Sequence, residues 1–303
     1  MLDAAARAGR TPVNKFPPVE ARVQFKELRK GLLPPTPAIG AVNDFNIAGR
    51  RGAIPVRHYR PVNKASETLS VLIYFHGGGW VVGDLETHDS LCRQLANAGE
   101  CAVISVDYRM GPEDKFPAAV DDAEDVVRYV ATNAEKLNID AGRIAVGGDS
   151  AGGNLAAVVS ILCRDSNGPA IKFQLLIYPA TDMEMGHPSH TLFAEGYNLT
   201  RDLMHYFRGH YLNDMAEIKD WRASPLYAKN LANLPPAYVI TAGFDPLRDE
   251  GKEFADKLTL AGNKVLYECF DGMIHGFITM SGVLKVANEA IAECGKELRA
   301  YLN

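Results

Sequence analysis

The sequence has few of the features that mark cross-linked, membrane-spanning or nucleic-acid-binding proteins. Its five cysteines are scattered and include no Cys-x-x-Cys pair, which argues against a disulfide framework. No apolar run approaches the roughly 18 residues needed to cross a bilayer, and the N-terminal residues show no apolar signal core. With a net charge of −5, no basic tract could neutralise a row of phosphates. We therefore expect a cytoplasmic protein that binds neither membrane nor nucleic acid.

What the chain does contain is an alternation of apolar segments and helical patterns. Its 303 residues, 47% of them hydrophobic, are enough for one large domain with a sizeable core. Nearly continuous apolar runs predict strands covered on both faces, and helices between them predict a mostly parallel sheet. The expected strands are Val71–Phe75, Cys101–Val106, Ile144–Gly147, Phe173–Tyr178, Ala237–Ala242 and Val265–Phe270, and the expected helices between them are Leu91–Ala98, Ala118–Leu137, Ala151–Arg164 and Leu247–Ala261. The fold class is α/β.

Three segments fall outside that alternation. An antiparallel hairpin is expected from Asn43–Ala48 and Ile54–Tyr59, which flank a glycine-containing turn. Residues 18–33 have the pattern of an amphipathic helix ahead of any strand. Residues 182–231 form an insertion too long for an ordinary connection, and such insertions are usually functional. We interpret residues 1–45 and about 182–231 as a helical cap on a catalytic domain that spans residues 46–303.

A strand-to-helix turn carries the candidate nucleophile. Ser150 lies in the Gly-x-Ser-x-Gly pattern of residues 148–152, directly between the strand Ile144–Gly147 and the helix Ala151–Arg164. Such a sharp turn crowds the positions two before and two after the serine, so that only very small residues fit there. The rival glycine motifs are absent, because no Gly-Lys-Ser/Thr follows and no Gly-x-Gly-x-x-Gly occurs. The pattern predicts an exposed, activated serine.

A run of three glycines, within His76-Gly77-Gly78-Gly79-Trp80, directly follows the strand Val71–Phe75. Adjacent glycines cost conformational entropy, but they allow backbone N–H groups to approach a substrate closely. Two of these amides, together with that of Ala151, could stabilise a developing oxyanion. We interpret His76 as a structural residue that orients the loop.

The general base and its orienting acid are expected at later strand ends, in the order Ser, Asp, His. Asp245 follows the strand Ala237–Ala242, and we favour it over Asp249, which Pro246 should carry into a helix. His275 follows the strand Val265–Phe270 and stands beside a glycine that permits a tight loop. No set of His, Cys and Asp residues has the spacing of metal ligands, so we expect neither a metal nor an organic cofactor.

Taken together, these motifs resemble the hormone-sensitive-lipase-like (bacterial family IV) carboxylesterases of the α/β-hydrolase superfamily. The resemblance covers roughly residues 40–300. It implies an eight-stranded sheet under a cap, with the amides of Gly78, Gly79 and Ala151 as the oxyanion hole. One departure from the family pattern is Met110-Gly111, where Leu-Ala is usual. The motifs that carry the resemblance are HGGGW, GDSAGG, Asp107-Tyr108-Arg109, Pro112-Glu113, Phe116-Pro117-Ala118, Asp245-Pro246-Leu247-Arg248-Asp249 and His275-Gly276-Phe277.

The expected activity is hydrolysis of short-chain acyl esters through an acyl-enzyme. The alternatives are a lipase or an amidase on the same fold, and a small-molecule binding module. Receptors that resemble the family and no longer catalyse lack the catalytic histidine, whereas His275 is present here. A homodimer through the strand Val265–Phe270 is expected from the family. The cap should line the substrate pocket, and the pocket residues we expect are Trp80, Asp149, His187, Phe193, Tyr197 and Phe207.

Overall fold

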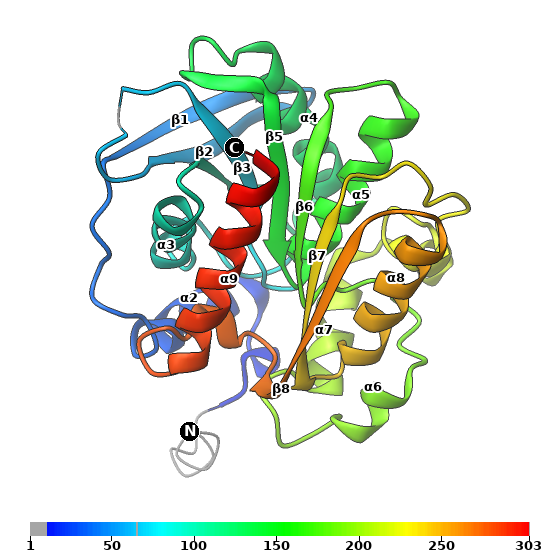
Figure 1. Cartoon of the computed structure of the whole chain (residues 1–303). Coiled ribbons are helices and arrows are strands. Elements are labelled where there is room, and N and C mark those ends of the chain that lie inside the picture. The colour runs from blue at the N-terminus through cyan, green and yellow to red at the C-terminus, as the bar shows by residue number, and fades with distance from the viewer. Residues whose placement is uncertain (1–10, 65, 303) are drawn as a thin grey trace.

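A twisted, mostly parallel sheet runs through the middle of the molecule (Figure 1). The coordinates are a computed structural model, which describes residues 11–64 and 66–302. The eight strands lie in the order β1-β2-β4-β3-β5-β6-β7-β8; β1, β2 and β4 pair antiparallel, and all other neighbours pair parallel. Their bounds are β1 Ala41–Gly49, β2 Gly52–Arg60, β3 Leu69–Phe75, β4 Ala102–Val106, β5 Ile139–Asp149, β6 Ile171–Ile177, β7 Ala237–Phe244 and β8 Val265–Ile274. The expected α/β fold is confirmed.

Helices cover both faces of this sheet. Helices α3 and α9 pack on one face, and α4, α5 and α8 pack on the other. Every residue of β3 and β4 is buried, as expected of strands with neighbours on both sides and helices on both faces. The bounds of the five helices are α3 Asp89–Gly99, α4 Ala118–Thr132, α5 Ala151–Asp165, α8 Arg248–Leu260 and α9 Lys285–Leu302.

Helix α4 ends five residues before the position that the sequence predicted. Residues 133–138 form turns in place of a further helical stretch. Asn138 has a left-handed backbone with φ of 52°, and the Ile139 N–H donates to the Ala134 carbonyl at 3.0 Å. This geometry turns the chain into β5, a reversal that apolar periodicity alone did not indicate.

Two segments far apart in sequence gather at the carboxyl ends of the parallel strands (Figure 1). The first contains η1 Val13–Lys15 and α2 Pro18–Lys30, and the second contains α6 Pro188–Leu192, α7 Arg201–Tyr211, η2 Met215–Lys219 and η3 Pro225–Tyr227. The Tyr206 hydroxyl donates to the Phe16 carbonyl at 3.0 Å, which joins the two segments directly. Strand β1 begins at Ala41, so the sheet starts slightly before residue 46. The short helix η4, Phe277–Thr279, completes this end of the molecule.

Helix α2 is attached to the sheet domain by charged side chains. Arg22 pairs with Glu113 at 2.6 Å, and its Nε donates to the Val81 carbonyl at 2.8 Å. Lys26 pairs with Asp84 at 3.0 Å. Exposed pairs of this kind contribute little individually, but together with buried Ala21 they define where the helix lies.

The cysteines are all free thiols, and four of the five are buried. Among the helices of the described residues, none combines the length and the apolar character that a bilayer crossing demands.

Candidate active site

Ser150 stands at the turn between β5 and α5. Its backbone has φ of 58°, a conformation that most residues avoid, and its N–H donates to the Ile177 carbonyl at 2.9 Å. A Cβ at Gly148 or Gly152 would collide with the carbonyl oxygen of Phe75 in the neighbouring strand. These close approaches explain why the two flanking positions hold glycine, as the sequence pattern predicted.

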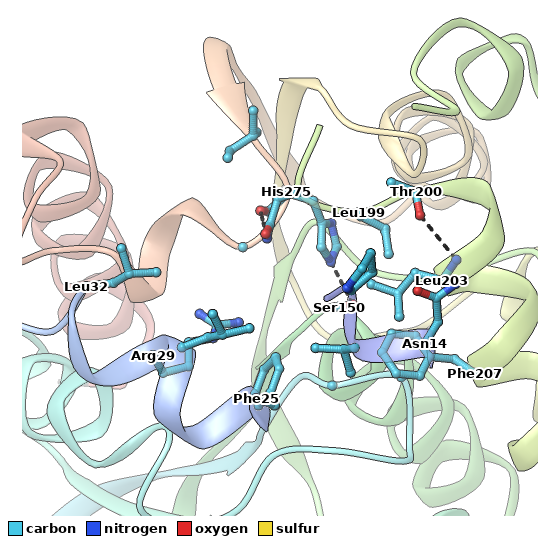
Figure 2. Close-up of a pocket in the computed structure, with 18 of the residues that line it drawn as sticks. Asn14, Phe25, Arg29, Leu32, Ser150, Leu199, Thr200, Leu203, Phe207 and His275 are labelled. Atoms are coloured by element: carbon cyan, nitrogen blue, oxygen red, sulfur yellow. Dashed lines mark hydrogen bonds between the residues drawn. The ribbon is translucent and has the colours of Figure 1, made fainter. Parts of the chain in front are cut away.

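His275 and Asp245 form a continuous hydrogen-bonded chain with Ser150 (Figure 2). The His275 Nε2 atom lies 2.9 Å from Ser150 Oγ, and its Nδ1 atom lies 2.7 Å from Asp245 Oδ2. Asp245 is fully buried and accepts a second hydrogen bond from the Leu247 N–H at 2.8 Å. The histidine is therefore oriented with one nitrogen toward a carboxylate and the other toward a hydroxyl, an arrangement suited to general base catalysis.

The rival carboxylate, Asp249, has a different environment. It lies in the first turn of α8, where its Oδ2 accepts the Ser189 N–H at 2.9 Å and its Oδ1 accepts from the adjacent Arg248 at 2.8 Å. The structure brings Asp245, and not Asp249, to His275.

Three backbone amides beside Ser150 have no hydrogen-bond partner within the described part of the chain: those of Gly78, Gly79 and Ala151. Gly78 has φ of 129° and Gly79 has φ of 61°, and a Cβ at either position would collide with a neighbour. The first glycine of the run differs, because the Gly77 N–H donates to Asp149 Oδ1 at 2.9 Å. Two glycine amides and the start of α5 are thus available for a negative oxygen.

The Asp149 carboxylate holds this glycine loop in position through hydrogen bonds. Besides Gly77, its carboxylate accepts the Tyr74 hydroxyl at 2.8 Å and lies 3.3 Å from His88 Nε2. Burial alone would raise the pKa of Asp149, but interaction with His88, the Tyr74 hydrogen bond and the charge of Arg29 lower that pKa below the usual range. The carboxylate stays charged and positions the loop.

His76 has the structural role that the sequence indicated. Its ring is fully buried and stacks on Tyr108 with centroids 4.4 Å apart, and its Nδ1 lies 2.9 Å from the Gly77 carbonyl. Burial lowers the pKa of His76 to about 4, so the ring is neutral at pH 7.

A cavity of about 360 Å³ lies beside Ser150 and His275 (Figure 2). Its floor is Ser150, His275 and the glycine loop, and its walls come from α2, α7 and the segments next to them. The apolar wall residues are Pro12, Val13, Phe25, Leu28, Leu32, Leu199, Leu203, Phe207, Ile274 and Met280, and the polar ones are Thr11, Asn14, Arg29, Asp149, Asn198 and Thr200.

Of the six residues expected in the pocket, Asp149 and Phe207 line this cavity. Trp80 does not, because its positive φ of 58° turns the indole into the core, where it stacks on Tyr211 at 4.3 Å. His187 lies away from the cavity, 3.0 Å from Glu253 on α8. Phe193 and Tyr197 pack against each other and against Phe244, the last residue of β7. The last three side chains were misplaced because the insertion packs partly on α8 and β7.

Five of the six polar wall residues were not expected from the sequence, and two of these, Arg29 and Asn198, lie closest to the loop that carries His275. Arg29 extends into the cavity from α2, and the Asn198 side chain donates to the His275 carbonyl at 3.0 Å. A signal for Arg29 was available, because it stands four residues after Phe25, and positions four apart share a helix face.

His187, His190 and Glu250 form the one cluster of potential metal ligands found among the described residues, with ligand atoms within 4.8 Å of one another. The His190 Nδ1 atom accepts the His187 N–H at 3.1 Å, so the ring proton lies on Nε2, which faces Glu250 at 2.7 Å. Coordination through that Nε2 would require the loss of this proton. The cluster is better suited to internal hydrogen bonding than to holding a metal. No spacing in the sequence indicated this cluster, because the fold brings Glu250 of α8 to His187 and His190 of the insertion.

The comparisons with known proteins agree with this geometry. A family model described as alpha/beta hydrolase fold matches residues 72–279, more than two thirds of the chain. The chain belongs to this family of α/β hydrolases. This match confirms the resemblance to hormone-sensitive-lipase-like esterases that the sequence motifs indicated.

Several members of the family are similar over most of the chain. The carboxylic ester hydrolase LipN of Mycobacterium tuberculosis is 42% identical over 86% of this chain and 71% of its own length. The ethyl acetate hydrolase of Pseudomonas putida is 35% identical over 100% of this chain and 96% of its own. Among solved structures, an ester hydrolase from the metagenome of Lake Arreo is 44% identical, covers 99% of this chain and 95% of its own, and has a TM-score of 0.95.

Proposed function

We propose that this α/β hydrolase is a serine carboxylesterase that cleaves small carboxylic esters through an acyl-enzyme. The observation that carries the proposal is the chain Asp245–His275–Ser150, with spacings of 2.7 and 2.9 Å. Beside it are a cavity and three backbone amides without a partner among the described residues. The ester-hydrolase names of the relatives support the same reaction class.

In the proposed reaction His275 removes the Ser150 proton as Oγ attacks the ester carbonyl, and Asp245 stabilises the imidazolium that forms. The amides of Gly78, Gly79 and Ala151 stabilise the oxyanion of the tetrahedral intermediate. His275 then gives its proton to the leaving alcohol, and water hydrolyses the acyl-enzyme by the same steps. Every group that these reaction steps require is a side chain or backbone amide of the protein, or the attacking water. We therefore propose that no cofactor takes part. Full activity after EDTA treatment is the expected result, and loss restored by zinc would contradict it.

The direct test is covalent labelling. A 4-nitrophenyl phosphonate should add one phosphonyl group to the protein and abolish hydrolysis of 4-nitrophenyl butyrate. Ser150→Ala should neither label nor turn over, while Ser166→Ala, which changes a serine at the far end of α5, should do both normally. Turnover at the normal rate by Ser150→Ala would refute the proposal.

A second test separates the two aspartates. Asp245→Asn should lower kcat on the order of 10⁴-fold, as loss of a triad acid does in other serine hydrolases. Asp249→Asn should leave kcat close to wild type, because its carboxylate bonds Ser189 and Arg248 instead. The reverse ranking would show that the acid is wrongly assigned.

Preference for short acyl chains is the finer part of the proposal. It is supported by the cavity volume of about 360 Å³ and by the apolar walls that α2 and α7 contribute. We propose that residues 1–45 and 182–231 act as a cap that selects the substrate. A kcat/KM profile over 4-nitrophenyl esters from acetate to palmitate should peak at short chains and shift when Leu28 or Leu203 is replaced by alanine. An unchanged profile would exclude the cap as the selecting element.

A homodimer through β8 remains part of the proposal, since β8 is an edge strand that pairs with β7 and leaves Leu266 45% exposed. A monomeric mass by light scattering at micromolar concentration would refute it.

We also propose a cytoplasmic location, which the five free cysteines support.

A further inference from the structure

Arg29 places a guanidinium group in the wall of the catalytic cavity. Figure 2 shows it on α2, across the drawn cavity from Leu203 and Phe207. Its Cζ lies 4.7 Å from the centre of the Phe25 ring, and a methyl group at Gly276 would lie 3.7 Å from its Nη2. The cation therefore stands beside the loop that carries His275, within the same space as the nucleophile.

This cation has no carboxylate partner within 4.0 Å among the described residues. Its one hydrogen bond there joins Nη1 to the Thr279 hydroxyl. Two other cations on the same helix do have carboxylate partners, because Arg22 pairs with Glu113 and Lys26 pairs with Asp84. The charge that acts most strongly on Arg29 is Asp149, which is already bound to Tyr74 and Gly77.

An arginine in this position is costly unless something in the cavity binds it. A guanidinium keeps its charge under all ordinary conditions and offers five N–H donors in a planar fork. Burial lowers the pKa of Arg29, which reports the loss of water around it. The nearby walls are Phe25, Leu28 and Leu32, so the local environment is largely apolar and strengthens any charge–charge contact.

We propose that Arg29 binds a carboxylate of the substrate, and that the preferred esters carry one in addition to the scissile ester. A carboxylate matches the guanidinium fork with two parallel hydrogen bonds. The substrate class is then the monoesters of dicarboxylic acids, with the carboxylate on the acyl side, or acylated hydroxy acids, with the carboxylate on the alcohol side. This inference rests on the proposed esterase function.

The experiment compares charged and neutral esters of equal chain length. On the acyl side, 4-nitrophenyl hemisuccinate, hemiglutarate and hemiadipate are measured against 4-nitrophenyl butyrate, pentanoate and hexanoate. On the alcohol side, butyrylated 4-hydroxybutyrate is measured against butyl butyrate in a pH-stat. The quantity is the ratio of kcat/KM for the charged ester to that for its neutral partner. One of the two sides should show a high ratio in the wild type, and that side identifies the source of the carboxylate.

Arg29→Met should lower that ratio by about 10- to 100-fold, mainly through a higher KM for the charged ester, the effect expected from loss of a charged hydrogen-bond partner. Arg29→Lys should keep part of the preference. Lys30→Met is the matched control, because it removes from the same helix an exposed charge, which pairs with Glu27. Its ratio should equal the wild-type one.

If Arg29→Met changes charged and neutral substrates equally, or leaves the ratio unaltered on both sides, the inference is overturned although the esterase proposal stands. If the wild type hydrolyses no ester of either kind, the esterase proposal itself fails. Should Arg29→Met fold poorly, inhibition of the wild type decides: glutarate should compete with substrate more strongly than pentanoate, and equal inhibition would contradict the role of Arg29.

Discussion

Because His187 is protonated in the folded protein, the free energy of unfolding should decrease as the pH rises from about 6.5 to about 9. The ring is 13% exposed, its Nδ1 lies 3.3 Å from Asp182 and its Nε2 lies 3.0 Å from Glu253. The interactions with Asp182 and Glu253 raise the pKa of His187 from 6.5 to about 9, against the effect of burial. The contact joins the insertion to α8, so it contributes to the position of the insertion.

The sign follows from comparing the folded and unfolded states. Below about pH 6.5 the imidazole is protonated in both states, and the stabilisation by the two carboxylates is fully present. Between pH 6.5 and about 9 the unfolded state loses the proton while the folded state keeps it, so the free energy of unfolding falls. A rise from 6.5 to about 9 corresponds to about 3 kcal/mol at most. Because Glu253 is 44% exposed, solvent screening should reduce this to about 1–2 kcal/mol.

The assay is urea unfolding of the wild type and His187→Gln at intervals between pH 6 and 9.5. The difference in unfolding free energy between the two proteins should be largest at pH 6 and should disappear near pH 9.5. His205→Gln is the control, because burial and the charge of Arg208 lower the pKa of His205, so that its protonation does not stabilise the fold. A His187→Gln protein whose stability follows the wild-type pH curve in parallel would refute the reasoning.

Three further changes have expected outcomes. Gly152→Ala would drive a methyl group into the backbone of β3 at Phe75, which cannot move aside, so soluble folded protein should be lost; a normal melting temperature would contradict this. Gly79→Ala collides with the Phe207 ring, a side chain that can be removed, so kcat/KM should fall and partly recover in the double variant with Phe207→Ala; equal activity of single and double variants would argue against that collision. Trp80→Ala should lower the unfolding free energy by about 3–5 kcal/mol, as expected for a buried aromatic, and a change in substrate preference alone would contradict its place in the core.

The strands of the sheet were accessible from the sequence because each is a compact apolar run with a marked turn after it. The runs at 71–75, 237–242 and 265–270 all correspond to strands within a few residues. Parallel strands end at one edge, so the residues that follow them could be expected to meet there. This is why Ser150, Asp245 and His275 could be predicted as neighbours.

Side-chain direction could not be predicted in the same way. Trp80 follows the glycine loop directly, but one positive φ angle turns it from the cavity to the core. His187 depends on Glu253 of α8, 66 residues later, for its location and for part of the interaction that raises its pKa. Positions set by such distant contacts carry no local periodicity. The spacing of His187 and His190, matched by Glu250 and Glu253, was the one signal that could have indicated their contact.

The two faces of helix α2 have different roles. Arg22 and Lys26 hold it to the sheet domain through exposed ion pairs, while Phe25, Leu28 and Arg29 face the cavity. Since Asp245 and His275 belong to loops after β7 and β8, substitutions on this thirteen-residue helix leave the reactive groups untouched. Substrate range could therefore diverge among related enzymes by exchange of one surface helix, and a library confined to α2 is a compact starting point for altering selectivity.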